Sequence, residues 1–371
     1  MRVGIIGGGQ LAQMMIQAGI SLGLDFSLLC SDQDESAPPF CLDTIRVPEL
    51  NLEILSDFVE KCDVITFDHE LIDPTLLENV PNQKLKLFPG ANTLRFAANK
   101  INTRLLLEKH NIPAPKFEIT HNNAQLEFAI EKVGYPCVIK SARGGYDGRG
   151  IYMIESPVDF VEFNRLAHSS MEFVVEEKVD IDAEFATLVV RDVFGLMQTY
   201  PVVHTLQTNS ICNEVVVPSG LEPELERCAT DLARRIAEIV DSVGVLAVEM
   251  FLVKGQLLVN ELAPRPHNSG HLTIEACETS QFENHLRAIT GLPLGSTKLI
   301  VPACAMVNIL GGPQFIDLNL SRKEALGVPD IRLHLYNKQY RPGRKLGHVT
   351  AVGQSSSDAL RSAQLASKYF E

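Results

Sequence analysis

Apolar and polar positions alternate in short blocks over the first hundred residues, in the pattern of strands joined by a helix. The apolar blocks Arg2–Ile6 and Phe26–Cys30 have strand length, and between them Leu11–Leu22 carries apolar residues at helical spacing. A further block, Asp63–Phe67, predicts another strand. Strands with a helix between them form a β-α-β unit, so this segment predicts a Rossmann-like parallel sheet.

The middle of the chain changes from helices to strands. Asn99–His110 and Gln125–Val133 have helical spacing, and Gly134 closes the second helix. Cys137–Lys140 predicts a short buried strand that ends in a lysine. Apolar residues between Leu225 and Val243 predict a later helix. Further strands are expected at Glu172–Val179, Glu184–Arg191, Met197–His204 and Glu214–Pro218.

A predicted β-hairpin with a carboxylate on each arm carries the clearest chemistry. Leu246–Leu252 holds Glu249, and after a polar turn Leu257–Val259 leads into Asn260 and Glu261. Buried carboxylates are costly unless a cation lies between them. Hard oxygen donors on rigid strands suit Mg²⁺, which binds one or two carboxylates together with substrate phosphates. The alternative is a pair of solvated strand carboxylates.

The loop after this hairpin is dense in recognition groups: Arg265, His267, Asn268, Ser269 and His271. Such a density beside a predicted metal site favours an active site. The i,i+4 spacing of the two histidines could also suit zinc. A proline before the first and a glycine between them disfavour a continuous helix, and no third ligand is evident.

Lys140 runs directly into a glycine-rich loop that ends at Gly150. Four glycines in the seven residues from Gly144 expose backbone N–H groups, which suits a loop that covers phosphates. The order differs from a Walker A sequence, because the lysine precedes the glycines. A plain hairpin loop would explain the glycines but not the charged and aromatic residues around them, Lys140, Arg143, Tyr146, Asp147 and Arg149.

The N-terminal turn from Gly7 to Ala12 satisfies G-x-G-x-x-A, and Asp32 follows about 20 residues on, as a ribose-binding acid would. NAD is therefore one interpretation. The same turn at a helix N-terminus can bind any phosphate or make a tight connection. Asp68 and Glu70 follow a strand end, where open α/β sheets bind ligands, although a capped loop is the alternative.

Composition bounds the function classes. A length of 371 residues with 45% hydrophobic residues suits two or three domains with real cores, and mean hydropathy is near zero. The net charge of −13 argues against nucleic-acid partners and a polybasic membrane patch. The eight scattered cysteines indicate reduced, mostly buried thiols of a cytoplasmic protein. Glycines and Gln10 interrupt any signal-peptide core, and no apolar run approaches membrane-span length.

Together these pieces resemble the ATP-grasp superfamily. More narrowly, the motifs GGYDGRG, NELAPRPHNSGH and RPGRKLGH resemble those of 5-(carboxyamino)imidazole ribonucleotide synthases, and the resemblance covers nearly the whole chain. It implies an α/β fold of the α+β ATP-grasp kind. The expected domains are a Rossmann-like substrate domain at 1–98, a mobile ATP-grasp lid at 99–179, a central ATP-grasp domain with the metal site at 180–300, and a small β-rich C-terminal domain at 301–371.

The resemblance implies ATP-dependent carboxylation of 5-aminoimidazole ribonucleotide by bicarbonate through carboxyphosphate, in purine biosynthesis. The implied cofactors are ATP and one or two Mg²⁺ ions, and a cytoplasmic homodimer is expected. The rivals are another ATP-grasp ligase, an NAD-dependent oxidoreductase using Asp32, and a catalytically inactive nucleotide-binding regulator.

The resemblance also implies roles for particular residues. The implied Mg²⁺ ligands are Glu249 and Glu261. The residues implied for nucleotide binding are Arg95, Lys100, Lys140, Gly145, Gly148, Gly150, Glu176, Glu177, Lys178, Val179, Glu184, Gln207 and Asn260. The implied catalytic residues are Tyr146, Asp147, Arg149, His267, Arg344 and Lys345, and the implied ribonucleotide contacts are Gln10, Glu70, Asn268, Ser269 and Lys338.

This chain departs from the family pattern at a few positions. Gln207 stands where many members have histidine near the nucleotide, and Leu272 stands where many have tryptophan. Ile151 replaces a glutamine, and Asp68 replaces a glutamate. These departures leave the implied reaction class unchanged and affect the details of nucleotide contact.

Overall fold

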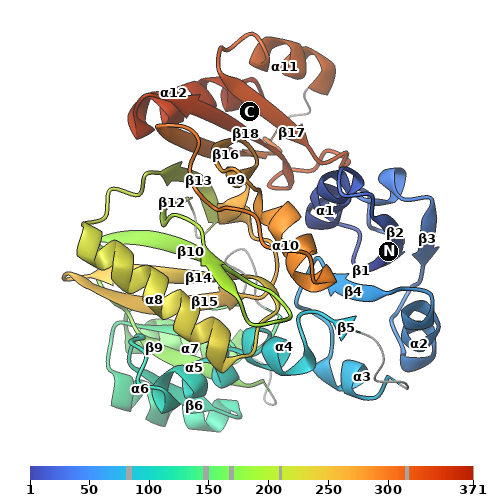
Figure 1. Cartoon of the computed structure of the whole chain (residues 1–371). Helices are drawn as coiled ribbons and strands as arrows, with labels where there is room; N and C mark the ends of the chain where they lie inside the picture. The colour runs from blue at the N-terminus through green and yellow to red at the C-terminus, as the bar shows by residue number, and fades with distance from the viewer. Residues whose placement is uncertain (81–85, 145–149, 167–170, 209–210, 314–316, 371) are drawn as a thin grey trace.

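The computed structural model describes residues 1–80, 86–144, 150–166, 171–208, 211–313 and 317–370, and the strands in these ranges form three sheets (Figure 1). The N-terminal sheet is wholly parallel, with strand order β3-β2-β1-β4-β5, which confirms the predicted Rossmann-like unit. Its strands are β1 (Arg2–Ile6), β2 (Asp25–Cys30), β3 (Asp43–Arg46), β4 (Val64–Phe67) and β5 (Lys86–Leu87).

Helices cover both faces of this sheet because its strands are apolar on both sides. Leu11, Met15 and Ile16 of α1 pack on one face, and Leu55 and Phe58 of α2 pack on the other. The helical segments here are α1 (Gln10–Ile20), η1 (Pro38–Phe40), α2 (Leu52–Glu60), α3 (Pro74–Glu78) and α4 (Ala91–Ala97).

A small antiparallel sheet with order β6-β9-β7-β8 forms the predicted lid region. Leu126 and Ile130 of α6 pack with Ile139 and Val175 of the sheet, and Gly134 ends α6 at a φ of +95°. The elements are α5 (Lys100–Lys109), β6 (Phe117–Thr120), η2 (Asn123–Gln125), α6 (Leu126–Val133), β7 (Cys137–Ser141), β8 (Ile151–Ile154), α7 (Pro157–Leu166) and β9 (Phe173–Glu177).

The remaining strands form one nine-stranded sheet, with path β15-β14-β10-β12-β13-β16-β18-β17 and β11 paired to β10. The strands of residues 301–371 therefore continue the central sheet. The strands are β10 (Ala183–Arg191), β11 (Met197–Thr199), β12 (Val203–Thr208), β13 (Ile211–Val217), β14 (Gly244–Val253), β15 (Gln256–Ala263), β16 (Ala303–Leu310), β17 (Ile331–Leu335) and β18 (Lys345–Gly353).

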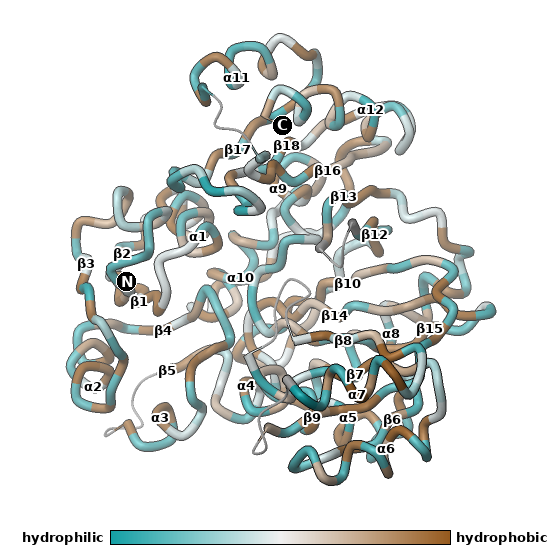
Figure 2. The backbone as a smooth tube through the Cα atoms, turned by 180° about the vertical axis from the view of Figure 1, so that it is seen from behind, coloured by the Kyte–Doolittle hydropathy of each residue, from teal (hydrophilic) through white to brown (hydrophobic). Residues whose placement is uncertain are grey.

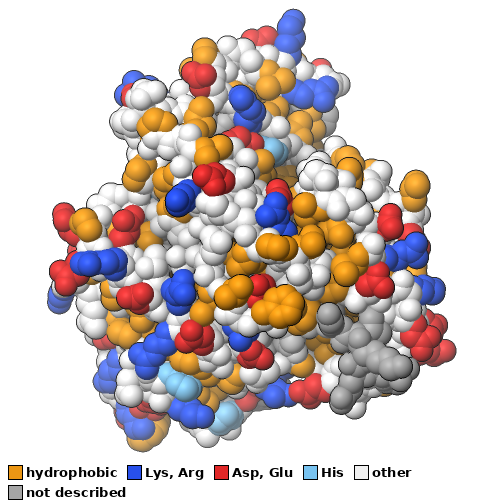
Figure 3. Space-filling view, in the orientation of Figure 1, with side chains coloured by type: hydrophobic (Ala, Val, Ile, Leu, Met, Phe, Trp, Pro, Cys, Tyr) orange, Lys and Arg blue, Asp and Glu red, His pale blue; other side chains and the backbone are white. Residues whose placement is uncertain are grey.

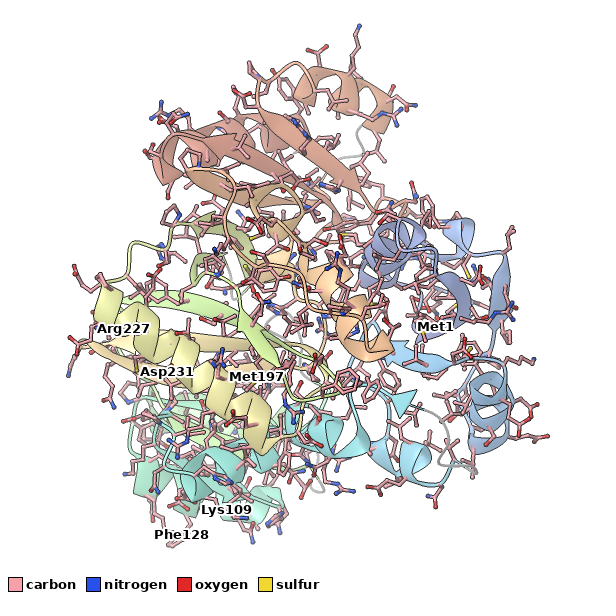
Figure 4. All side chains as sticks on the ribbon, viewed as in Figure 1. Met1, Lys109, Phe128, Met197, Arg227 and Asp231 are labelled. Atoms are coloured by element: carbon pink, nitrogen blue, oxygen red, sulfur yellow. The ribbon has the colours of Figure 1, made fainter. Side chains whose placement is uncertain are left out.

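Helices cover this large sheet. In α8, Leu232 and Ile236 pack on the sheet, while Arg227 and Asp231 point away from it (Figure 4). That arrangement confirms the helix predicted from apolar spacing. The helical segments are α8 (Pro223–Ile239), η3 (Asn268–Gly270), α9 (Thr273–Ala276), α10 (Gln281–Thr290), α11 (Leu318–Ala325), α12 (Ser356–Ser367) and η4 (Lys368–Phe370).

One predicted strand is wrong. Met197–His204 is not continuous, because β11 ends at Thr199 and β12 begins at Val203. Pro201 has no N–H group for a ladder, and Tyr200 turns inward to donate its hydroxyl to the Thr279 carbonyl at 3.1 Å. The prediction for the cysteines is confirmed, since all eight are free and six are buried.

The three sheets meet around α10 and the end of the lid sheet. Figures 1 and 2 show α10 between the N-terminal sheet and β14, and the four-stranded sheet below the large sheet. Among the described helices, none is long and apolar enough to cross a membrane.

Candidate active site

A cavity of about 580 Å³ lies where the three sheets meet. Its walls come from the glycine turn, the lid strands, the β14–β15 hairpin and the start of β18. Fifteen of the residues predicted for the site line it: Gln10, Glu70, Lys140, Glu176, Glu177, Lys178, Val179, Glu184, Gln207, Glu249, Asn260, Glu261, His267, Asn268 and Lys345.

The β14–β15 hairpin confirms the predicted pair of carboxylates and adds a β-bulge. Glu249 pairs with Glu261, whereas the next pair joins Met250 to Val259, so Asn260 is the extra residue. In a regular strand, Asn260 and Glu261 would face opposite sides of the sheet. Both line the cavity here, because the bulge redirects the strand at that point.

Glu249 lies in a setting that disfavours its charge. Burial, with Glu261 and Glu184 nearby, raises the pKa of Glu249 to about 8. His267 Nε2 lies 3.2 Å from its Oε1. Lys100 forms an ion pair with Glu261 on the other arm. Two convergent carboxylates of this kind favour a bound cation.

Lys140 lies at the centre of a buried polar network. Its Nζ is 2.8 Å from Glu176 Oε2 and donates to Asn260 Oδ1 at 3.0 Å. The other oxygen of Glu176 accepts from Arg104 Nε at 2.6 Å. Burial would raise the pKa of Glu176, but Lys140 and Arg104 outweigh that effect and hold it at about 2.

The two ends of the chain meet next to the end of the cavity that Gln10 and Lys345 line, although Lys338 and Arg344 are not in the described lining. Lys338 Nζ donates to Gln10 Oε1 at 2.7 Å, and Arg344 Nη1 lies 2.9 Å from Glu35 Oε2. Burial, with Arg344 close by, lowers the pKa of Lys338 to about 8. Lys345 lines the cavity itself. These cations are suited to an anionic group of a substrate.

The recognition loop divides its side chains between the cavity and its support. Asn268 lines the cavity and exchanges two hydrogen bonds with Asn308, of 2.8 and 3.0 Å. Ser269 is fully buried beside His267, with Oγ 2.9 Å from Nδ1. His271 is also fully buried, against Phe282 and His348, and it belongs to the wall of the cavity. Ser269 therefore holds the loop, and its predicted substrate contact has no support from its position.

Other predicted residues lie elsewhere. Arg95 pairs with Glu78 at the surface, and the described lining of the cavity does not include it. The carbonyl of Gly150 accepts the Ser141 N–H at 2.8 Å, at the base of the loop. The remaining loop residues, Gly145, Tyr146, Asp147, Gly148 and Arg149, lie outside the described residues.

Within the described ranges, no three His, Cys, Asp or Glu side chains converge as a metal cage. His267 and His271 both line the cavity, but a zinc site there has no support, because the described residues supply no third ligand. Two carboxylates with phosphate and water would still satisfy Mg²⁺.

Sequence reasoning assigned no role to Arg104 and Glu35, which lie behind the cavity lining, and named Arg265 only as one of the recognition groups of its loop. Arg104 is one helical turn after Lys100, so the i,i+4 spacing could have placed both on one face of α5. Arg265 makes two hydrogen bonds to Glu70, of 2.5 and 3.1 Å, and lines the cavity. No sequence pattern could have indicated Glu35, because its partner Arg344 lies near the other end of the chain.

Comparison with known proteins agrees with this geometry. Family models match at residues 1–98 (ribonucleotide synthetase preATP-grasp domain), 105–282 (ATP-grasp domain) and 304–362 (phosphoribosylaminoimidazole carboxylase C-terminal domain). The N5-carboxyaminoimidazole ribonucleotide synthase of Mycobacterium tuberculosis is 38% identical, over 99% of this chain and 87% of its own length.

The chain belongs to the N5-carboxyaminoimidazole ribonucleotide synthase family. The Aquifex aeolicus member is 38% identical over 98% of this chain and 95% of its own. A crystal structure from Aspergillus clavatus, in complex with ADP and 5-aminoimidazole ribonucleotide, has a TM-score of 0.91 and 32% identity, covering 100% of this chain and 98% of that one. This synthase family member is thus an ATP-dependent carbon–nitrogen ligase with an ATP-grasp fold.

The oxidoreductase alternative fails in this family, and the glycine turn gives a physical reason. Asp68 Oδ2 accepts the Gly9 N–H at 2.5 Å. A side-chain carboxyl group thus already occupies a turn N–H that a dinucleotide phosphate would use.

Proposed function

We propose that the protein carboxylates 5-aminoimidazole ribonucleotide with bicarbonate and ATP, giving 5-(carboxyamino)imidazole ribonucleotide, ADP and phosphate in de novo purine biosynthesis. The observation that carries this proposal is one cavity that joins a nucleotide end around Lys140 to a cationic end around Lys345. Such a cavity can hold two phosphorylated substrates next to each other.

At the nucleotide end, we assign Lys140 and Lys100 to the ATP phosphates and Glu184 to the ribose. The backbone from Glu176 to Val179 follows β9 at the cavity wall, which suits adenine. Gln207 hydrogen-bonds to Glu184, so the residue that replaces the family's histidine orients the ribose contact.

The residues fit Mg²⁺, because Glu249 and Glu261 are paired, cavity-facing oxygen donors on adjacent strands. When bound, Mg²⁺ would neutralise phosphate charge during transfer. Asn260 holds Lys140 beside this position at 3.0 Å. The same ion would offset the burial and the repulsion from Glu261 and Glu184 that together raise the pKa of Glu249.

The reaction has two steps. A bicarbonate oxygen attacks the γ-phosphorus of ATP, the bond to ADP breaks, and carboxyphosphate forms. The ribonucleotide amine then attacks the carboxyl carbon, phosphate leaves, and the nitrogen loses a proton. We assign that proton to Asp147, with Tyr146 and Arg149 beside it, on the family motif. Carboxyphosphate hydrolyses readily, so the lid must exclude water.

At the cationic end, Lys338, Arg344 and Lys345 would bind the ribonucleotide phosphate, with Gln10 and Glu70 on the sugar and base. Arg265 holds Glu70 in place and keeps it ionised, since burial would raise its pKa but Arg265 brings it to about 2. His267 and Asn268 line the cavity, and we assign them to the reacting carboxyl group.

The deciding experiment is ADP release with each substrate omitted in turn. We expect release only with bicarbonate and 5-aminoimidazole ribonucleotide together, and transfer of ¹³C from bicarbonate to the amine. Release with another amine acceptor would indicate a different ATP-grasp ligase. Nucleotide binding without release would indicate an inactive regulator.

We also propose a homodimer through an apolar surface at the end of α10. Phe194 and Leu196 in the β10–β11 turn are 76% and 67% exposed, and Ile20 at the end of α1 is 63% exposed. Figure 3 shows hydrophobic side chains gathered over α10 on this face. An exposed apolar patch of this kind favours association. Light scattering should give a dimer, and Phe194→Lys should give a monomer; a monomeric wild type would contradict the proposal.

A further inference from the structure

We infer that Arg104 is a positioning residue for ATP. It balances the charge of Glu176, so that the cluster of Arg104, Glu176 and Lys140 keeps a net positive charge that can attract phosphates. The inference rests on the proposed nucleotide end of the cavity. The described lining of the cavity includes Lys140 and Glu176 but not Arg104. Arg104 would therefore act on ATP through Glu176.

The geometry places one carboxylate between two cations. Glu176 receives Arg104 Nε on Oε1 at 2.6 Å and Lys140 Nζ on Oε2 at 2.8 Å. The Arg104 and Glu176 side chains are 3% exposed, and Lys140 is 10% exposed. At such burial water screens these charges weakly, so the balance among them sets the local potential.

Charge counting shows what Arg104 contributes. With Arg104, the three groups sum to one positive charge beside the phosphate position. Without it, Lys140 and Glu176 form a neutral pair, and phosphate would have to compete with Glu176 for the ammonium group. Arg104 thus lets a buried lysine have a carboxylate partner and still attract an anion.

Arg104 also connects three elements next to the proposed nucleotide position. It projects from α5, binds Glu176 on β9, and places Nη1 3.5 Å from the Val259 carbonyl on β15. Val259 precedes Asn260, which accepts from Lys140. Lys100, one turn earlier on α5, pairs with Glu261. One face of α5 therefore positions both Lys140, which we assign to the phosphates, and β15, which carries Glu261.

The test is a double-mutant cycle read by binding. Arg104→Met should weaken MgADP about 10-fold in calorimetry, leave the affinity for 5-aminoimidazole ribonucleotide within twofold, and raise the KM for ATP with little change in kcat at saturation. Adding Glu176→Gln should restore at least fivefold of the MgADP affinity, because the uncompensated carboxylate is gone. If Arg104 only supported the fold, the losses of MgADP affinity in Arg104→Met and Glu176→Gln would instead add in the double variant.

The control is Arg191→Met, which removes a partly buried arginine that pairs with Asp241 at 2.8 Å outside the described cavity lining. It should leave MgADP binding unchanged. Unchanged MgADP affinity in Arg104→Met, or a double variant no tighter than the single one, would overturn the inference. If Arg104→Met does not fold, Arg104→Lys takes its place. An MgADP affinity within threefold of wild type would support the inference, and a loss of MgADP affinity above 10-fold in folded Arg104→Lys would overturn it. These binding assays do not depend on turnover, so they remain valid if the proposed carboxylation fails.

Discussion

His285 Nε2 lies 2.7 Å from Thr66 Oγ1, across the junction between the N-terminal sheet and the large sheet. The other ring nitrogen accepts the Val245 N–H at 3.1 Å, so Nε2 carries the proton and donates to Thr66. Both side chains are fully buried. One neutral imidazole therefore connects β4, α10 and β14, the strand that carries Glu249.

This junction predicts instability in acid. Burial lowers the pKa of His285 to about 3, against about 6.5 in the unfolded chain. The folded state binds fewer protons, so stability should fall as the pH drops below 6.5 and should level off only near 3. His285→Gln keeps a donor and an acceptor but does not titrate. From pH 7.5 to 5.5, wild type should lose about 1.4 kcal/mol more than this variant in urea unfolding.

The comparison between the two proteins isolates this ring, because the other buried histidines, His271 and His348, are present in both. An equal pH dependence in wild type and His285→Gln would show that the ring does not carry the effect.

The carboxylate pair predicts a loss of catalysis without a loss of fold. Glu261→Gln keeps the shape of a side chain that should lie between metal and phosphates but removes its charge. We expect at least ~100-fold slower turnover, the scale of a lost preorganised electrostatic contact. Steady-state ADP release at saturating Mg²⁺ measures the rate, and thermal unfolding measures the fold. Glu238→Gln on the exposed face of α8 is the control, and wild-type turnover in Glu261→Gln would exclude the metal role.

The site shows where sequence reasoning stops. Alternation of apolar residues located the hairpin, and the chemistry of Glu249 and Glu261 predicts a cation site there. The bulge at Asn260 could not be predicted, because no residue type there requires an extra position. Yet the bulge is what brings Asn260 and Glu261 to the same cavity.

Contacts between distant parts of the chain were equally hidden. Gln10 and Lys338 are 328 residues apart in sequence and meet at 2.7 Å. Motif resemblance named both residues, but only the fold shows that they touch. Arg104 lies in a helix predicted correctly from its spacing, and its partner Glu176 depends on how the lid sheet docks on α5. Periodicity defines elements, whereas tertiary packing defines which charges meet.

The glycine turn gives a third prediction. Gly7 has a φ of +102°, and a Cβ there would lie 1.8 Å from Asp68 Oδ1. Gly7→Ala should therefore destabilise the protein by about 2 kcal/mol or more in urea unfolding. Gly23→Ala is the matched control, because Gly23 has a φ of +68° and nothing within 4 Å of its Cβ position. It should cost about 1 kcal/mol from backbone strain alone. Equal losses would show that the contact with Asp68 is unimportant.

The cationic end gives the last prediction. Arg344 precedes Lys345, which lines the cavity, and Glu35 and the Gln339 carbonyl hold Arg344 at 2.9 and 3.0 Å. If it binds the ribonucleotide phosphate, Arg344→Ala should remove a charge-assisted contact of about 1.5–3 kcal/mol, or about 10- to 150-fold in affinity. MgADP binding should be unchanged, because Lys140 and Lys100 lie at the other end. Calorimetry with each ligand separates the two effects, and Arg322→Ala on α11 controls for loss of a surface arginine.

In thermal unfolding, 5-aminoimidazole ribonucleotide should protect wild type and NAD should not. Unchanged ribonucleotide affinity in Arg344→Ala, or stabilisation by micromolar NAD, would mean that the phosphate binds elsewhere in the cavity or that the turn serves a dinucleotide.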